Sequence, residues 1–181
     1  MTALTRNPTN KDLLQSTKFR LNFGILPGMT YFCQSANLPG VALNEIIRNT
    51  PFVDLYSPGE KISYDTLNIT FLLDEEIQAW EQLHDWIRNL TFPTDFKEYK
   101  DLERMSRVSN YRSSVNLKPQ FSDGSLTIFT NKNNASIRIN FKDLFPTTLG
   151  SILFNAADTA DNIISADASF RFSYYNIERI A

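Results

Sequence analysis

The sequence is poor in the residues from which metal and redox sites are built. It contains one cysteine, Cys33, and one histidine, His84, among 181 residues. A single cysteine has no partner for an internal disulfide, and the common structural zinc sites need four Cys or His ligands. We therefore expect no metal site and no cofactor, and we expect Cys33 to be a reduced, buried, small hydrophobic residue.

Glycine is also scarce, with six residues in the whole chain. The sequence has no phosphate-binding glycine loop, no dinucleotide fingerprint and no Gly-x-Ser-x-Gly turn.

His84 lies at the edge of an apolar helical stripe, where a packed or capped histidine is far more common than a catalyst. The run Asp74-Glu75-Glu76 is better explained by helix capping than by carboxylate-dependent hydrolysis. Nothing in these patterns supports an enzyme.

The chain has neither a large excess of one charge sign nor a long apolar run. The 18 basic and 20 acidic residues leave a net charge of −2, so the chain as a whole has no electrostatic attraction for nucleic acid or an anionic membrane. No segment approaches the roughly 20 apolar residues that span a bilayer, and the first residues lack the apolar core of a signal peptide. We expect a soluble protein, made in the cytoplasm, without membrane binding by this chain.

Aromatic residues are plentiful instead. The chain has 14 Phe and 7 Tyr, concentrated in strand-like runs, which favours a β-rich fold. Alternating apolar and polar residues predict strands at residues 19–23, 67–73, 125–130, 137–142 and 168–174.

Less regular segments separate these strands. We expect residues 29–36 to form the hairpin partner of the first strand, residues 143–150 to be a connector, and residues 152–154 to be a short strand. Residues 1–16 are polar and are predicted to form an extended N-terminal arm.

One segment, residues 74–90, has a convincing helical period. Its apolar positions recur every three or four residues and are widened by two neighbours: Ile77, Trp80, Leu83, Ile87 and Leu90, with Ala79 and Trp86. Asp74 is the expected N-cap. The chain is therefore predicted to be a single domain over residues 1–181, mainly β with α+β character: an antiparallel β-sandwich or small barrel closed by one amphipathic α-helix.

A long hairpin is predicted over residues 41–73, with arms at 41–48 and 61–73. The apolar phase slips in the return arm, which a β-bulge near Asp65 and Thr66 would explain. The connector at 49–60 is apolar where a solvated loop would be polar, and exposed apolar loop tips mark partner surfaces. We predict a subunit interface at Pro51, Phe52, Val53, Leu55 and Tyr56. The alternative is that these side chains fold back onto the monomer's own core.

Residues 91–120 form the least regular segment. Acidic and basic residues are mixed along it, and a short helix is possible at residues 95–105. A flexible surface loop and an interaction role are equally compatible with this composition.

Five pieces occur along the chain in a specific order. They are residues 32–40, residues 51–59 leading into Tyr64-Asp65, the strand ending in Asp74-Glu75-Glu76 before the Trp-bearing helix, residues 139–150 with Leu-Phe-Pro-Thr-Thr-Leu-Gly, and the aromatic C-terminal strand. Each piece is short, but together they cover most of the chain. In this order they resemble the tail tube protein family of contractile-tailed bacteriophages.

The resemblance implies a structural virion protein of the tail. In that family, hexameric rings stack into a tube for genome ejection, and an inner sheet from each subunit joins its neighbours around the lumen. DNA and tape-measure protein pass through without specific DNA binding. Residues 41–73 would be the hairpin that bridges subunits, and the implied partners are further copies, the tail sheath, the baseplate hub and the tape-measure protein.

Two kinds of alternative remain open. Tube-like baseplate hub or initiator proteins share the same core, and the long 91–120 segment departs from the plain connection expected of shaft subunits. From different classes, a β-sandwich module that recognises glycans should bind sugars as a monomer through exposed aromatic residues, and a carboxylate-dependent hydrolase should lose activity after one Asp or Glu substitution.

Overall fold

The structure is a computed structural model that describes residues 12–91, 120–155 and 163–180. The helices are α1 (Pro27–Phe32) and α2 (Gln78–Thr91). The strands are β1 (Phe19–Phe23), β2 (Cys33–Ala36), β3 (Val41–Arg48), β4 (Leu55–Tyr64), β5 (Leu67–Leu72), β6 (Ser122–Phe129), β7 (Ala135–Leu149), β8 (Ser165–Arg171) and β9 (Tyr174–Arg179). Neither of these helices has the length and apolar character needed to cross a membrane.

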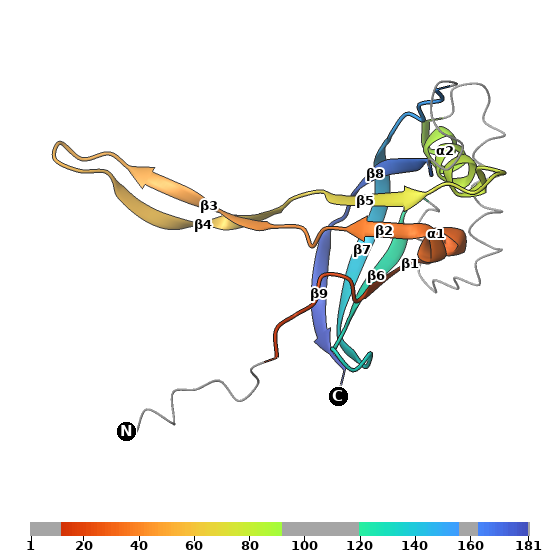
Figure 1. Cartoon of the computed structure of the whole chain (residues 1–181). Helices are drawn as coiled ribbons and strands as arrows, with labels where there is room; N and C mark the ends of the chain where they lie inside the picture. The colour runs from red at the N-terminus through yellow and green to blue at the C-terminus, as the bar shows by residue number, and fades with distance from the viewer. Residues whose placement is uncertain (1–11, 92–119, 156–162, 181) are drawn as a thin grey trace.

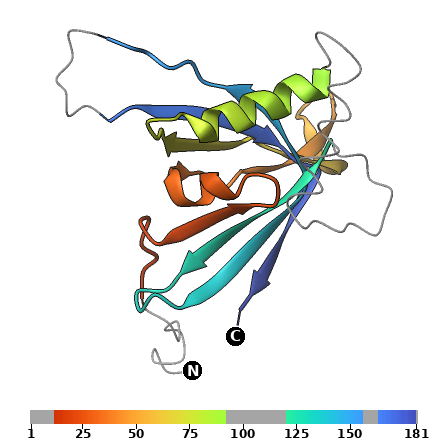
Figure 2. The same cartoon turned by 90° about the vertical axis from the view of Figure 1, so that its right-hand side faces the viewer.

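Seven strands form one antiparallel sheet in the order β1-β6-β7-β8-β5-β2, and β9 pairs with β7. The 15-residue strand β7 connects its two halves. Residues 137–142 of β7 pair with β9, and residues 145–149 pair with β8. Between them, Asp143 has a φ of 54°, a left-handed conformation that interrupts the regular pleat. The sheet therefore curves around a core without closing into a barrel, and α2 lies across its open side (Figures 1 and 2).

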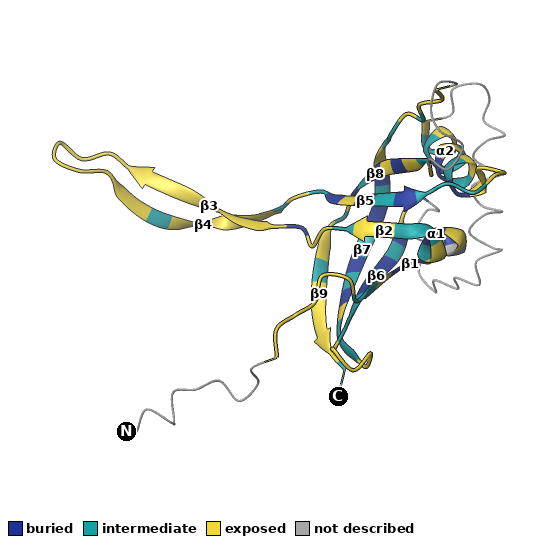
Figure 3. Cartoon of the chain, in the orientation of Figure 1, coloured by how far each residue is buried: buried dark blue, intermediate teal, exposed yellow. Residues whose placement is uncertain are grey.

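The core lies between the concave face of the sheet and the two helices (Figure 3). Alternation delivers one apolar row from each strand. The largest fully buried side chains of the core are Trp86, Phe23, Phe71, Phe141, Phe170, Leu21, Leu26, Met29, Leu67, Ile69 and Leu83. The rings of Phe23 and Phe170 stack with centroids 4.9 Å apart, joining the two halves of the sheet. The prediction of a mainly β, antiparallel fold closed by one amphipathic helix is confirmed.

The long helix begins later than predicted. Asp74 does act as a cap, because its carboxylate accepts a hydrogen bond from the Gln78 amide at 3.0 Å. However, Ile77 has a φ of 48°, which is incompatible with a right-handed helix, so α2 starts at Gln78 rather than at residue 74. Trp86 points into the core, while half-buried Trp80 donates from its indole nitrogen to the Gly150 carbonyl at 3.2 Å.

Several strand predictions were wrong because pairing is decided by distant segments. Residues 29–36 do not pair with β1; Pro27 opens helix α1, a position that proline favours, and β2 pairs with β5. The predicted connector at 143–150 continues β7 through Leu149. Residues 152–154 are not a strand, and the predicted last strand is divided into β8 and β9.

Two predicted segments lie largely outside the described residues. The N-terminal arm is described only from residue 12, and residues 12–16 contain no helix or strand. The segment predicted at 91–120 is described only at its two ends, residues 91 and 120.

Candidate subunit interface

The hairpin β3–β4 stands away from the rest of the molecule (Figure 1). Among the described residues its strands pair only with each other, from Val41 opposite Tyr64 to Arg48 opposite Leu55. The predicted extent, residues 41–73, was wrong at one end: β5 belongs to the main sheet, and the hairpin ends at Tyr64. A two-stranded hairpin without a supporting layer is only marginally stable in water. The projecting part therefore gains the most from a second surface.

Large apolar side chains are exposed along the whole hairpin. They come from both strands and from the turn between them: Val41, Leu43, Ile46, Ile47, Phe52, Val53, Leu55, Tyr56 and Ile62. Such a continuous exposed patch is characteristic of a surface that meets another protein. Most of the hairpin is yellow in Figure 3, in contrast to the buried rows of the main sheet.

The five residues predicted from the sequence all lie at the far end of this hairpin. Pro51, Phe52 and Val53 belong to the connection between the strands, which is only residues 49–54, whereas Leu55 and Tyr56 begin β4. The Phe52 side chain is 98% exposed. The alternative in which these side chains fold back onto their own core is therefore wrong for the isolated chain.

The tip has its own local structure. The Thr50 hydroxyl contacts the Val53 carbonyl and also accepts a hydrogen bond from the Val53 amide at 3.3 Å. Such side-chain bonds to nearby backbone close a tight turn. They hold Phe52 outward at the end of the hairpin.

Sequence reasoning missed the strand residues Leu43, Ile46, Ile47 and Ile62. Their segments show no clean alternation, which is a signal that both faces are apolar. The irregularity is real: the register shifts between Leu43 and Glu45. The bulge is thus on β4, where residues 59–61 face the single residue Asn44 of β3, and not near Asp65 and Thr66, where the chain instead passes from β4 to β5.

Gly59 lies within this bulge, on β4. A Cβ atom placed on Gly59 would be 2.5 Å from the Asn44 carbonyl oxygen, far closer than non-bonded atoms approach. Glycine therefore allows the bulged strand β4 to approach the Asn44 backbone of β3 closely, and the bulge bends and twists the hairpin.

The base of the hairpin is anchored to the main sheet by aromatic residues. The Tyr64 ring lies 5.5 Å from the Phe172 ring and 5.2 Å from the Tyr175 ring, measured between centroids. The Tyr175 hydroxyl donates to the Pro39 carbonyl at 3.4 Å. Packed aromatic pairs of this kind restrict motion. They fix the direction in which the hairpin leaves the body.

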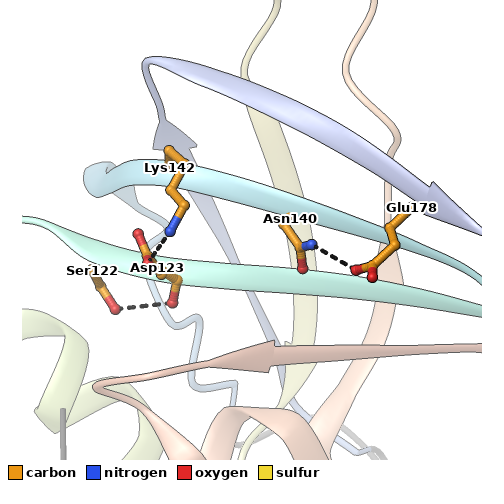
Figure 4. Close-up of polar contacts among 5 residues, drawn as sticks. All are labelled: Ser122, Asp123, Asn140, Lys142 and Glu178. Atoms are coloured by element: carbon orange, nitrogen blue, oxygen red, sulfur yellow. Dashed lines mark hydrogen bonds and ion pairs between the residues drawn. The ribbon is translucent and has the colours of Figure 1, made fainter. Parts of the chain in front are cut away.

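A second surface is the convex face of strands β1, β6, β7 and β9, opposite the core. Lys142 Nζ lies 2.6 Å from Asp123 Oδ2, and the Asn140 amide donates to Glu178 at 3.4 Å (Figure 4). The hydrogen bond that Lys142 donates to the Asp123 carboxylate raises the pKa of Lys142. Arg138 lies directly opposite Glu178 in the β7–β9 register. On this face Lys142 is therefore paired with a carboxylate, and Arg138 has a carboxylate opposite it on the neighbouring strand.

The sequence singles out two side chains with potential for chemistry, His84 and Cys33. Within residues 12–91, 120–155 and 163–180, no group of three or more His, Cys, Asp or Glu side chains is placed to hold a metal ion. His84 stacks on Trp80 with ring centroids 5.3 Å apart and is about half exposed. Cys33 is only partly buried, yet desolvation raises the pKa of its thiol to about 11. A thiol that stays protonated is a poor nucleophile.

Comparison with known proteins links this architecture to phage tails. A family model described as "Phage tail tube protein" matches residues 9–178. The tail tube terminator protein of Enterobacteria phage T4 is 22% identical over 125 residues, which cover 67% of this chain and 61% of that protein. The chain thus matches less than two thirds of that relative's length.

Solved structures share the fold at low sequence identity. The tube-terminating cap of the anti-feeding prophage superposes with a TM-score of 0.65 and 13% identity over 99% of this chain and 100% of that one. A chain of the sheath–tube complex of the extracellular contractile injection system PVC gives a TM-score of 0.58 and 11% identity over 94% of each chain. The family model spans the projecting hairpin and both halves of the curved sheet, and the chain belongs to the phage tail tube protein family.

Proposed function

We propose that this chain is a non-enzymatic structural subunit of a phage tail tube, assembled as a hexameric ring in which each β3–β4 hairpin reaches onto the neighbouring copy. The observation that carries the proposal is the exposed apolar hairpin with Phe52 at its end. Burying one such side chain contributes roughly 1.5–3 kcal/mol. Repeated at every interface of a ring, contacts of this kind favour assembly.

The free edges of the sheet support a ring. Within the described residues, β1 pairs only with β6 and β9 pairs only with β7, so each has an unpaired side. A cyclic arrangement removes exposed strand edges that otherwise promote aggregation. Their position at opposite edges of one half-sheet suits head-to-tail contacts between identical copies.

The convex polar face is our proposed lining of the lumen. Lysine or arginine side chains without partners would hold DNA through release of its counterions. On this face Lys142 is paired with Asp123, and Arg20 lies over the Phe129 ring at 5.8 Å. A polar surface with partnered charges allows DNA and tape-measure protein to move past.

Among the positions in a tail, we favour the end of the tube. The T4 relative is named a tail tube terminator, and the anti-feeding prophage chain that superposes over full length is a tube-terminating cap. In that position the partners are the last tube ring and the tail sheath, in the virion tail. A shaft subunit or a baseplate initiator would share the ring but not the copy number: a terminator contributes one ring for each tail, and a shaft subunit a whole tube.

The test compares Phe52→Ala with Phe154→Ala, which removes the same side chain from another exposed position. Sedimentation velocity and negative-stain microscopy should show rings for the wild type and for Phe154→Ala, and monomers for Phe52→Ala at the same concentration. At a concentration low enough for all three to be monomeric, they should unfold at nearly the same temperature. A wild type that stays monomeric at high concentration and with tail partners, or that binds glycans as a monomer, would refute the proposal.

A further inference from the structure

An apolar groove lies at the end of the body farthest from the helices. Its volume is about 610 Å³, and its apolar lining comes from the segment before β1 and from both arms of the β6–β7 hairpin: Leu13, Leu14, Ile128, Phe129 and Ile137. Leu13 and Leu14 line this groove but are 84% and 71% exposed. No described part of the chain covers them.

The groove is preformed by backbone contacts. The Phe129 amide donates to the Lys18 carbonyl at 3.0 Å, and Lys18 Nζ donates to the Asn131 carbonyl at 2.6 Å. The turn is closed by the Thr130 amide, which donates to the Asn134 carbonyl at 2.8 Å. Ile128 and Ile137 pack against the core behind it. The groove therefore has a rigid floor, which reduces the ordering cost of binding.

We propose that this groove receives the hairpin tip, Phe52 and Val53, of a neighbouring copy. The inference rests on the proposed ring and names the surface that the hairpin meets. The tip offers two apolar side chains with no cover of their own, and the groove has room for both. An exposed protrusion and a separate pocket on the same chain form a head-to-tail contact, which generates rings.

Charge complements shape at this contact. Asp54 follows the tip residues, and exposed Lys132 lies at the groove. Asp12 also lines the groove, but it has an interaction of its own. Seating Phe52 in the groove would bring the Asp54 carboxylate toward the rim, where an opposite charge favours the correct register.

The hairpin cannot fill its own groove. The tip lies at the far end of strands of eight and ten residues, which at about 3.3 Å per residue extend for roughly 25 Å or more. The β6–β7 turn lies at a different end of the molecule, near the C-terminus (Figure 1). A second copy is required to bring them together.

A depression elsewhere on the surface does not match the tip. It lies over β2, β5 and β8, where polar side chains bond one another: Thr70 donates to Asp167 at 2.8 Å, and Ser169 donates to Asn68 at 2.8 Å. Placing Phe52 there would break these hydrogen bonds, and the Phe52 ring would gain no apolar surface to pack against.

A charge exchange tests the pairing. Asp54→Lys and Lys132→Glu should each weaken ring formation about two- to fivefold per contact at low salt, and the double variant should recover it. The control is Glu60→Lys combined with Lys132→Glu, because exposed Glu60 lies along the hairpin and away from its tip. That pair should show no recovery.

A disulfide test locates the contact directly. Copies carrying Val53→Cys are mixed with copies carrying Leu14→Cys, both with Cys33→Ala, and oxidised mildly. A cross-linked dimer that forms with this pair, but not with Val53→Cys and Ser169→Cys, supports the inference. Wild-type rings with neither charge recovery nor this cross-link would overturn the groove assignment and leave the proposed function intact. A wild type that forms no rings would remove both.

Discussion

The two tryptophans of α2 differ in burial and in hydrogen bonding. We predict that the more buried one, Trp86, tolerates replacement by phenylalanine with a smaller loss of stability than Trp80. Trp86 is fully buried, and within the described residues its indole N–H has no hydrogen-bond partner. Trp80 is only half-buried, but its N–H donates to the Gly150 carbonyl at 3.2 Å. Replacing each by phenylalanine removes the indole nitrogen and keeps an aromatic ring.

The expected free energies of unfolding follow from these differences. Trp86→Phe loses two buried carbon atoms, worth about 1.6 kcal/mol at about 0.8 kcal/mol each. It also removes a buried donor without a partner, whose desolvation costs about 1–3 kcal/mol. The two effects offset, so we expect a net change within about 1 kcal/mol.

Trp80→Phe has no such compensation. It loses a hydrogen bond with a net value of about 0.5–1.5 kcal/mol and leaves the Gly150 carbonyl without this donor. It also loses part of the same carbon contact. We therefore expect Trp80→Phe to be more destabilising than Trp86→Phe by about 1 kcal/mol.

The measurement is urea unfolding followed by far-ultraviolet circular dichroism, at a concentration where the chain is monomeric. Trp86→Ala is the control for loss of the whole side chain, with an expected cost of about 3–5 kcal/mol. The reasoning is refuted if Trp86→Phe is clearly more destabilising than Trp80→Phe. That result would mean that the Trp86 N–H has a favourable partner, such as a buried water.

Two further predictions concern the hairpin and the thiol. Gly59→Ala should reduce amide protection in residues 41–64, because its Cβ meets the Asn44 carbonyl at 2.5 Å; Gly28→Ala, with nothing within 4 Å, should leave protection unchanged, and equal effects would contradict the steric argument. Burial raises the pKa of Cys33 from 9.0 to about 11, so stability should be insensitive to this thiol below pH 9 and fall as pH rises toward 11. Chemical denaturation of the wild type and Cys33→Ala across this range should show the difference, and parallel curves would contradict it.

Local periodicity predicted those strands and helices that bury one face in the core and expose the other. β1, β5 and the β6–β7 hairpin each present one apolar row to the core, so alternation found them. The dry face of α2 was found in the same way. Its first residue was not, because the left-handed conformation of Ile77 has no signal in an apolar pattern that continues through it.

Pairing partners were not predictable from the same patterns. Alternation tells which face a side chain takes but not which strand lies beside it. β2 was expected next to β1 and lies next to β5. Residues 143–150 were expected to be a connector, yet β7 continues through Pro146, where the sheet bends and the register shifts, a position in which a missing amide donor is tolerated.

For the candidate interface, the sequence by itself determined the chemistry, since Pro51, Phe52, Val53, Leu55 and Tyr56 were recognisable as too apolar for a solvated loop. Only the tertiary structure decided that these residues end a hairpin projecting from the body, and that Leu43, Ile46, Ile47 and Ile62 belong to the same exposed patch. The physical reason is that an apolar run has the same sequence whether the monomer buries it or a neighbour must. Which of the two occurs depends on the direction in which the hairpin leaves the body, and the ring contacts of Tyr64 at its base fix that direction.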